Sequence, residues 1–384
     1  MEKVKRLYPL KFEEGSMVLD QNTVVANGFL AENSIDDIIE TYLEDFLGRD
    51  VFQYYKGEFP LRVSYLESDG NMPLQAHPND FTALERYESI GCAKVWYILE
   101  AEEDARICLG FSRQMDASSF YEECLGGDLE KDLNFIHPEP GDCIYIKPGT
   151  VYAAMGKMKI MEVAQNSKVT YHLYDLSGRK KKNNGEESDY QMEVAEAIDV
   201  VDYDPFDMEK CYFRKISGSL TIADTADFIV KMNMLSPDGK DEVLALNPEE
   251  AGSFIALLCL KGVAVVKGAD GVGYNFGAGE FILLPANLNE VTVVALNEDS
   301  GSAGEETLIV QAYMPKLSDS EDAYMNYYEV ESGYPTGSGL DSDEDYEDDE
   351  EDHECGCGED DCSCGCGDHH HHHHHHPSER FFRK

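Results

Sequence analysis

Two residues in the segment PLQAHPND, at positions 73 to 80, have side chains and a spacing that suit metal chemistry. Gln75 and His77 lie two residues apart, so on a strand both side chains face the same side. A glutamine oxygen and an imidazole nitrogen that point into one barrel supply half of a metal site. A buried histidine held by hydrogen bonds is the other outcome, and the pair by itself leaves both interpretations open.

A second set of metal-ligating side chains is concentrated near the C-terminus, among aspartates and glutamates. Five cysteines and eight consecutive histidines form this set: Cys355, Cys357, Cys362, Cys364, Cys366, His369, His370, His371, His372, His373, His374, His375 and His376. Such side chains bind soft divalent metals, and the carboxylates raise the local concentration of cations. A purification tag is the alternative, but PSERFFRK follows the histidines, so we favour a native metal-binding tail.

Short strands must position the Gln75–His77 pair. The first half of the chain contains runs rich in β-branched and aromatic residues, separated by Gly, Pro, Asp and Asn: residues 60–65, 94–99, 105–111, 143–147, 158–163 and 170–174. Helices are predicted at 34–48, with Ser34 as N-cap and Gly48 as the stop, and at 118–125. Many short strands with turns between them are typical of a barrel or a jelly roll.

The second half of the chain repeats this organisation. A short helical stretch at 192–198 precedes a strand-rich block from 211 to 314. Within it, GAGEFILLPANLNEVTV (277–293) has the same design as GDCIYIKPGTVYAAM (141–155): a glycine and an acid, a strand, a proline turn and another strand. This internal similarity predicts two barrels of one kind. From about residue 318 the composition becomes acidic and of low complexity, which predicts a disordered tail.

Charge and hydropathy exclude some classes of partner. The formal net charge is -45, so phosphate would be repelled and neither nucleic acid nor an anionic membrane is an expected partner. The apolar run at 254–266 is broken by Lys261 and is too short to span a bilayer. The N-terminal sequence MEKVKRLYPLKFEE lacks the apolar segment of a secretory signal, so we expect a cytoplasmic protein.

Several ordered blocks give the chain a resemblance to a known family. They are YPLKF (8–12), FPLRVSYLESDGNMPLQAHPND (59–80), GCAKVWYIL (91–99), PGDCIYIKPGTVYAAMGK (140–157), EVAQNSKVTYHLYD (162–175) and GEFILLPAN (279–287). Over roughly residues 7 to 315 the chain resembles the short bacterial class I mannose-6-phosphate isomerases of the cupin superfamily. The resemblance implies a zinc-dependent interconversion of mannose 6-phosphate and fructose 6-phosphate in carbohydrate metabolism.

The resemblance also implies a fold and a division into domains. The expected fold class is all-β with flanking helices, as two cupin-like jelly-roll barrels followed by a disordered acidic tail. Residues 1–175 would form the catalytic-type barrel, 176–210 a loop and connecting helix, 211–317 the second barrel, and 318–384 the Cys/His-rich tail.

The family's site residues are only partly present at the matching positions. The resemblance places two metal ligands at Gln75 and His77, as in the family. It places the glutamate ligand at Lys94, the second histidine ligand at Tyr152, and the catalytic arginine at His172. A lysine in place of a carboxylate replaces attraction by repulsion, and a tyrosine coordinates only as a phenolate, so both changes oppose binding of a metal ion.

These replacements predict that isomerase activity is weak or lost, as in a pseudoenzyme. We expect the Lys94 ammonium to replace the ion and to hydrogen-bond Gln75 or Tyr152. The first alternative is that the match misplaces the ligands and that His137 or His172 fills the gap. The second is a non-catalytic cupin that binds a sugar, a sugar phosphate or a protein partner, with metal handled by the tail.

Overall fold

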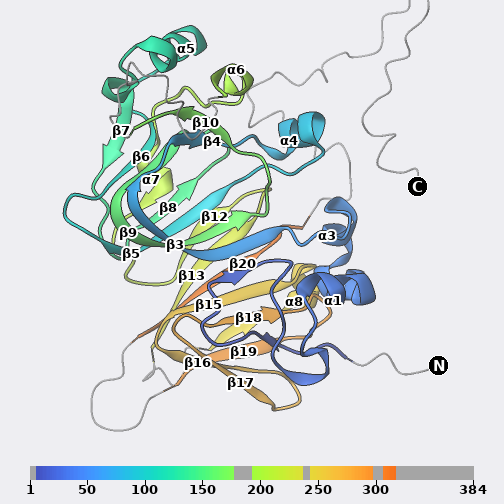
Figure 1. Ribbon diagram of the computed structural model, residues 1–384. Coiled ribbons are helices and arrows are strands. Elements are labelled where there is room, and N and C mark those ends of the chain that lie inside the picture. The colour runs from blue at the N-terminus through green and yellow to red at the C-terminus, as the bar shows by residue number, and fades with distance from the viewer. Residues whose placement is uncertain (1–5, 177–192, 237–242, 297–305, 317–384) are drawn as a thin grey trace, which may run out of the picture. The chain divides into compact units, whose positions relative to one another are not determined.

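The computed structural model describes residues 6–176, 193–236, 243–296 and 306–316 (Figure 1). Within these ranges the fold is all-β with flanking helices, as the sequence predicts. Residues 177–192 of the loop expected after the first barrel, and the tail from residue 318, lie outside the described residues. The cysteine and histidine candidates of the tail therefore stay predictions.

A ten-stranded sheet from the first half of the chain, here called the first barrel, carries the candidate site. Its main path runs β10-β4-β9-β5-β8-β11, and β2, β3, β6 and β7 join through β3 and β6, which both pair with β9. The bounds are β2 Val18–Leu19, β3 Leu61–Asn71, β4 Leu74–Ala76, β5 Lys94–Ala101, β6 Arg106–Phe111, β7 Leu133–Ile136, β8 Cys143–Ile146, β9 Tyr152–Gln165, β10 Tyr171–Tyr174 and β11 Tyr212–Phe213.

Two smaller sheets make up the second barrel. Their orders are β1-β18-β15-β20-β13-β12 and β14-β19-β16-β17. The bounds are β1 Leu10–Lys11, β12 Leu220–Asp224, β13 Ile229–Leu235, β14 Leu244–Leu246, β15 Ile255–Lys261, β16 Val263–Lys267, β17 Gly273–Gly277, β18 Phe281–Leu284, β19 Val291–Ala295 and β20 Thr307–Tyr313.

Two short strands pair with the sheet of the other half of the chain. β1, near the N-terminus, pairs antiparallel with β18 of the second barrel. β11, which follows the connecting segment, pairs antiparallel with β8 of the first barrel. Each barrel therefore includes an edge strand that lies far along the sequence from its other strands.

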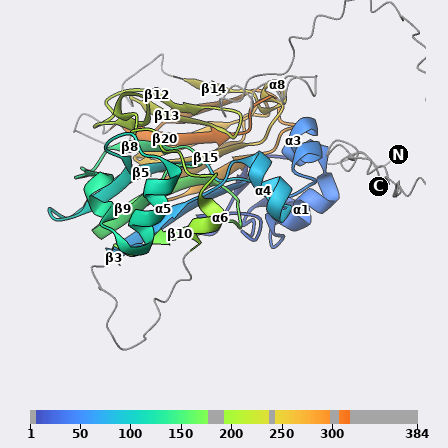
Figure 2. The same cartoon turned by 90° about the horizontal axis from the view of Figure 1, so that it is seen from above.

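The helices are short and lie outside the sheets. Their bounds are α1 Ile35–Tyr42, α2 Glu44–Leu47, α3 Arg49–Tyr54, α4 Asp80–Tyr87, α5 Ala117–Gly126, α6 Val194–Ala197, α7 Met208–Cys211 and α8 Pro248–Ala251, with 3-10 turns at Gly28–Leu30 and Leu129–Asp132. In both views α1, α3 and α4 lie at the same end of the sheets (Figures 1 and 2). None of the helices in the described ranges has the length and apolar character that crossing a membrane requires.

The helix predicted over 34–48 is present but broken. Ser34 caps α1 through a capping box with Asp37, as its position predicts. The chain then turns at Leu43, whose φ is +50°, and α2 continues to the glycine stop at Gly48, where φ is +94°. The break lets the chain start α3 directly after Gly48.

Alternation along the strands separates the cores. On β9, Tyr152 and Ala154 belong to the core inside the first barrel, whereas Ala153 and Met155 pack on its outer face with α5. Further along, Met161 and Val163 join a third core, which also contains Phe281 and Val310 of the second barrel. The two barrels therefore pack against each other through a continuous apolar layer, and the even-numbered residues of β9 face the interior.

Candidate functional site

Strand periodicity directs a set of polar side chains into the first barrel. On β5, Trp96 and Ile98 belong to the interior core while Val95 lies in the layer between the barrels. Lys94 is two residues before Trp96 and therefore faces the interior as well. On β4, Leu74 and Ala76 face outward, so Gln75 and the following His77 face inward, as the sequence predicts.

Lys94 and Glu162 form a buried ion pair in this interior. Lys94 Nζ lies 3.1 Å from Glu162 Oε2, and both residues are less than a tenth exposed. Trp96 Nε1 donates a hydrogen bond of 2.7 Å to the same oxygen. Two cationic or polar donors therefore converge on one carboxylate, which balances the charge of Lys94 inside the barrel.

His77 and Tyr152 form a second buried contact beside that pair. His77 Nδ1 lies 2.7 Å from the carbonyl oxygen of Val169, which can only accept, so Nδ1 carries the proton. Nε2 of the neutral ring is then an acceptor, and the Tyr152 hydroxyl donates to it across 2.6 Å. Gln75 Oε1 lies 3.4 Å from the same hydroxyl. The side chains at positions 75, 77 and 152 are thus brought together, as expected.

Tyr152 also joins this group to Lys94. Lys94 Nζ lies 5.9 Å from the centroid of the Tyr152 ring, and the Trp96 ring packs edge-on against it at 5.4 Å. The hydrogen bond of Lys94 goes to Glu162, which the sequence did not predict, and its ammonium lies beside Tyr152, one of the two partners that the sequence did predict. A lysine, a tyrosine, a histidine and a glutamate therefore occupy one continuous polar cluster.

Burial sets the protonation of this cluster. Burial, followed by the neighbouring Lys94 ammonium, lowers the pKa of His77 to about 3. Burial raises the pKa of the Tyr152 hydroxyl well above its usual range and that of the Cys92 thiol to about 11. Burial opposes the charge on Lys94, but Cys92, Tyr152 and Glu162 outweigh it and raise the lysine pKa. Glu162 is the carboxyl group that accepts a hydrogen bond from the Lys94 ammonium.

A buried aspartate that sequence reasoning missed supports the start of β5. Asp80 is 3% exposed, and its Oδ1 accepts from Gly91 N at 2.8 Å and from Gln165 Nε2 at 3.0 Å. Gln165 Oε1 in turn accepts from Ala93 N at 2.9 Å. These bonds hold the residues immediately before Lys94. Asp80 follows the α4 N-cap Asn79, and that local signal indicates a helix start rather than a supporting role in the barrel.

The two histidines weighed as replacement ligands lie in different environments. His172 is opposite Gln75 in the β10–β4 ladder, and its Nδ1 lies 3.8 Å from Glu193 Oε2. His137 is exposed after β7, and its Nδ1 lies 3.2 Å from the carbonyl oxygen of Ala105. His172 is therefore next to the polar cluster, and His137 is on the rim.

The residues present do not suit a divalent metal ion. The ammonium of Lys94 repels a cation, and the lone pair of His77 Nε2 already accepts the hydroxyl of Tyr152. Zinc prefers thiolate, imidazole and carboxylate ligands. Across the described part of the chain, no three His, Cys, Asp or Glu side chains are grouped so that they could hold a metal ion.

Comparison with known proteins gives a consistent set of relatives. No family model matches the chain. The "Probable mannose-6-phosphate isomerase GmuF" of Bacillus subtilis is 25% identical over 289 residues, which cover 70% of this chain and 81% of the relative. "Mannose-6-phosphate isomerase ManA" of the same organism is 26% identical over 275 residues, with the same coverage of 70% and 81%.

Solved structures show the same fold. The mannose 6-phosphate isomerase from Bacillus subtilis superposes with a TM-score of 0.59 at 23% identity, over 78% of this chain and 90% of the other. A variant of the phosphomannose isomerase from Salmonella typhimurium gives 0.57 at 14% identity, with 78% and 90% coverage. The all-β fold with flanking helices is therefore a fold that these enzymes share.

Proposed function

This chain belongs to the mannose-6-phosphate isomerase family, and from that premise we propose that it is a non-catalytic member of the family. Its first barrel has exchanged the divalent ion of the family for the Lys94 ammonium. The barrel binds a sugar or sugar phosphate without isomerising it. The observation that carries this proposal is the Lys94–Glu162 ion pair next to the Tyr152–His77 hydrogen bond.

Electrostatics supports the loss of the ion. Two unit charges about 4 Å apart interact by roughly 4 kcal/mol at an effective dielectric of 20, so a divalent ion beside an ammonium is opposed by about twice that amount. The glutamate that the family resemblance places at position 94 would attract the ion by a similar amount. The Oε2 oxygen of Glu162 already accepts hydrogen bonds from both Lys94 and Trp96.

Hydrogen bonding independently supports the proposed loss of the metal ion from the first barrel. A metal ion bound by His77 needs a free lone pair on one ring nitrogen. Nδ1 donates to Val169, and Nε2 accepts from Tyr152, so both nitrogens are engaged. Displacing the Tyr152 hydroxyl would leave a buried polar group without its partner, which costs about 1 to 3 kcal/mol.

The decisive experiment measures the metal content of the full chain and of its His77→Ala variant. The tail is identical in both, so any zinc it binds cancels in the difference. We expect the same zinc content in the two proteins. One equivalent of zinc lost from the variant would show that the barrel holds a metal ion and would refute the proposal.

A coupled assay for turnover of mannose 6-phosphate with added zinc tests the loss of activity. The ManA relative from Bacillus subtilis serves as the positive control. We expect the full chain to be slower by at least about a thousandfold, since a metal-assisted step contributes several kcal/mol. A rate within tenfold of the control would contradict the proposal.

The double variant Lys94→Glu/Tyr152→His shows whether the two replacements account for the loss. It restores the ligand types that the family resemblance places there. We expect it to hold one equivalent of zinc more than the unaltered full chain. Isothermal titration with mannose 6-phosphate, on the unaltered chain, measures binding without turnover.

Metal handling by the tail is a second proposal, which rests on sequence alone. The cysteines from 355 to 366 and the histidines from 369 to 376 are soft-metal ligands. Replacing the five cysteines by serine in the full chain is expected to lower its total zinc content. An unchanged zinc content would argue against a role of the cysteines.

A further inference from the structure

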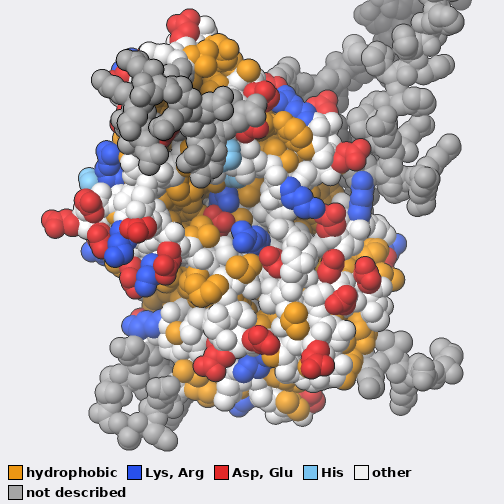
Figure 3. All heavy atoms as spheres, viewed as in Figure 1, with side chains coloured by type: hydrophobic (Ala, Val, Ile, Leu, Met, Phe, Trp, Pro, Cys, Tyr) orange, Lys and Arg blue, Asp and Glu red, His pale blue; other side chains and the backbone are white. Residues whose placement is uncertain are grey.

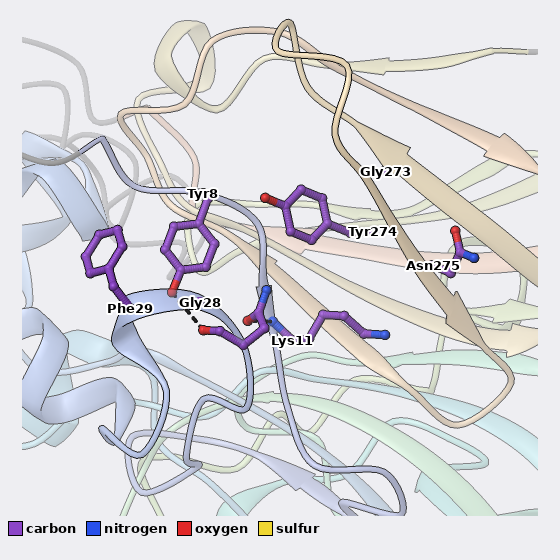
Figure 4. Close-up of a pocket in the computed structure, with 8 residues that line it drawn as sticks. Tyr8, Lys11, Gly28, Phe29, Gly273, Tyr274 and Asn275 are labelled. Atoms are coloured by element: carbon purple, nitrogen blue, oxygen red, sulfur yellow. Dashed lines mark hydrogen bonds between the residues drawn. The ribbon is translucent and has the colours of Figure 1, made fainter.

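A groove on the second barrel shares no residue with the polar cluster of the first. It has a volume of about 560 Å³ and lies between the N-terminal segment and β17. Eight residues line it: Tyr8, Lys11, Asn27, Gly28, Phe29, Gly273, Tyr274 and Asn275. Figure 4 shows the N-terminal residues on one wall and the β17 residues on the other. Its lining combines aromatic rings, amides and one cationic group.

The aromatic wall of the N-terminal segment is fixed in place. The Tyr8 hydroxyl donates to the carbonyl oxygen of Asn27 at 2.7 Å and accepts from Leu30 N at 2.9 Å. Its ring packs edge-on against Phe29 at 5.1 Å. A Cβ at Gly28, where φ is +66°, would fall 2.3 Å from the Tyr8 ring. Glycine is therefore required for this close approach, and Tyr8 offers the groove its ring rather than its hydroxyl.

The opposite wall comes from the edge of a sheet. β17 ends the order β14-β19-β16-β17, and in the described residues it pairs only with β16. Tyr274 lies across from Tyr8, with its hydroxyl directed toward that ring (Figure 4). Asn275 is exposed, and its amide has no hydrogen-bond partner among the described residues. This wall therefore supplies a second aromatic ring together with an amide that a ligand can reach.

Lys11 places a positive charge in the groove. Its ammonium makes no ion pair with any described carboxylate, although the chain carries a net charge of -45. Some other basic side chains do lie beside acidic ones, as in the pairs Lys131–Glu123 and Lys215–Glu139, and Figure 3 shows such a mixture over one face. An ammonium that is not neutralised by its neighbours favours an anionic group on whatever fills the groove.

We propose that this groove binds a pyranose that carries one anionic group. The apolar face of the sugar ring would pack on the Tyr8 and Tyr274 rings, because aromatic faces contact aliphatic C–H groups well. The sugar hydroxyls would reach the Asn275 amide, and the anion would meet Lys11. A few polar groups around an apolar platform are the usual arrangement of a small-molecule site. The site is separate from the first barrel and does not depend on the function proposed for that barrel.

Saturation-transfer NMR and isothermal titration on the full chain test the proposal with four probes. Glucose 6-phosphate and glucuronate carry the anion as phosphate or carboxylate, glucose lacks it, and inorganic phosphate lacks the sugar. We expect the two anionic sugars to bind about tenfold more tightly than glucose or phosphate. The stronger of the two anionic sugars identifies the anion. Phosphate that binds as tightly as glucose 6-phosphate would mean a plain anion site and would overturn the proposal, as would failure of both anionic sugars to bind.

Variants locate the binding. Lys11→Gln should weaken the anionic sugars about tenfold and leave glucose unchanged, whereas Lys157→Gln, an exposed lysine of the first barrel, changes the net charge equally and should have no effect. Tyr274→Ala should abolish the part of the sugar binding that Lys11→Gln weakens, and Tyr274→Phe, which keeps the ring, should retain it. Thermal melts establish that each variant is folded. Equal effects of the two lysine variants, or binding unaffected by all of them, would place the ligand elsewhere and refute the proposal.

Discussion

The two barrels contain the same glycine turn, but their interiors are filled by different side chains. Gly141 N donates to the Ile98 carbonyl at 2.8 Å in the first barrel, and Gly279 N donates to the Cys259 carbonyl at 2.8 Å in the second. The two glycines have φ values of +91° and +88°. These are the glycines of the two similar segments in the sequence, so the internal similarity reflects one local structure used twice.

Matching registers extend the comparison into the strands. Lys94 is opposite Ile146 in the first barrel, and Ile255 is opposite Leu284 at the equivalent place in the second. The second position is filled by an apolar residue that belongs to the core of that barrel. The fold therefore closes without a charge at this position, and the ammonium in the first barrel is not a requirement of the architecture.

Glu162, the partner of Lys94, also has a counterpart in the second barrel. Glu162 is opposite Trp96, and Gln311 is opposite Leu257 in the second barrel. Gln311 is 5% exposed and accepts from Asn233 Nδ2 at 3.3 Å. A neutral amide pair thus fills the second barrel where a charged pair fills the first. The fold therefore tolerates a polar side chain at this position in both barrels. A charged side chain occurs there only in the first barrel, where a partner of opposite charge is present.

The largest expected effect comes from moving the charge to the other barrel. Ile255→Lys places an ammonium at the equivalent of position 94, but the residue at the equivalent of Glu162 is neutral. We expect the free energy of unfolding to fall by about 4 kcal/mol, because a buried charge without a partner is strongly destabilising. Urea denaturation measures this change in the free energy of unfolding, and Ile255→Met is the control of similar volume. A loss below about 1 kcal/mol would show that the two interiors are equivalent.

Removing the carboxylate from the first barrel should have the next largest effect. Glu162→Gln leaves Lys94 without its counter-charge, so we expect a loss of about 3 kcal/mol in the free energy of unfolding. The single tryptophan, Trp96, donates to Glu162, so its fluorescence should shift as well. The double variant Lys94→Met/Glu162→Gln should lose less than the sum of the two single variants.

An exposed ion pair provides the control for that measurement. Lys159 Nζ lies 3.3 Å from Glu100 Oε1, and both side chains are exposed. Glu100→Gln should cost less than about 1 kcal/mol, since solvent screens the pair. If the buried and the exposed pair gave equal losses, or if the buried double variant were additive, Lys94 and Glu162 would not be coupled as the structure indicates.

The dependence of stability on pH should be the smallest effect over the range from pH 7.5 to 5. The pKa of His77 falls from 6.5 to about 3 on folding, so below pH 6.5 the unfolded chain binds a proton that the native barrel does not. Stability therefore decreases as the pH falls from about 6.5 toward 3, by at most about 1.4 kcal/mol per pH unit from this group. Denaturation curves at pH 7.5, 6 and 5 should show a smaller slope for His77→Gln, whereas the exposed His137→Gln should keep the slope of the unaltered chain.

Local sequence patterns predicted most of the secondary structure and missed features that depend on packing. The runs at 94–99 and 105–111 became β5 and β6 nearly as expected. The run at 158–163 is only part of β9, which begins at Tyr152 and pairs with β3 from Met155 onward. Ala153 and Ala154 lie outside the predicted runs of β-branched and aromatic residues, and their pairing with Cys108 and Ile107 of β6 extends the strand over them. Tertiary contact thus overrides weak local propensity.

The inward direction of Gln75 and His77 followed from their spacing, because side chains on a strand alternate between its faces. The hydrogen bond from Lys94 to Glu162 did not, because these residues are 68 positions apart and the contact depends on which strands are neighbours in the sheet. The sequence by itself determined the kinds of side chain and the face each one occupies, through the two-residue period of a strand. Only the tertiary structure decided which partner neutralises Lys94 and which ring nitrogen of His77 meets Tyr152, since these contacts depend on the order and register of strands brought together by folding.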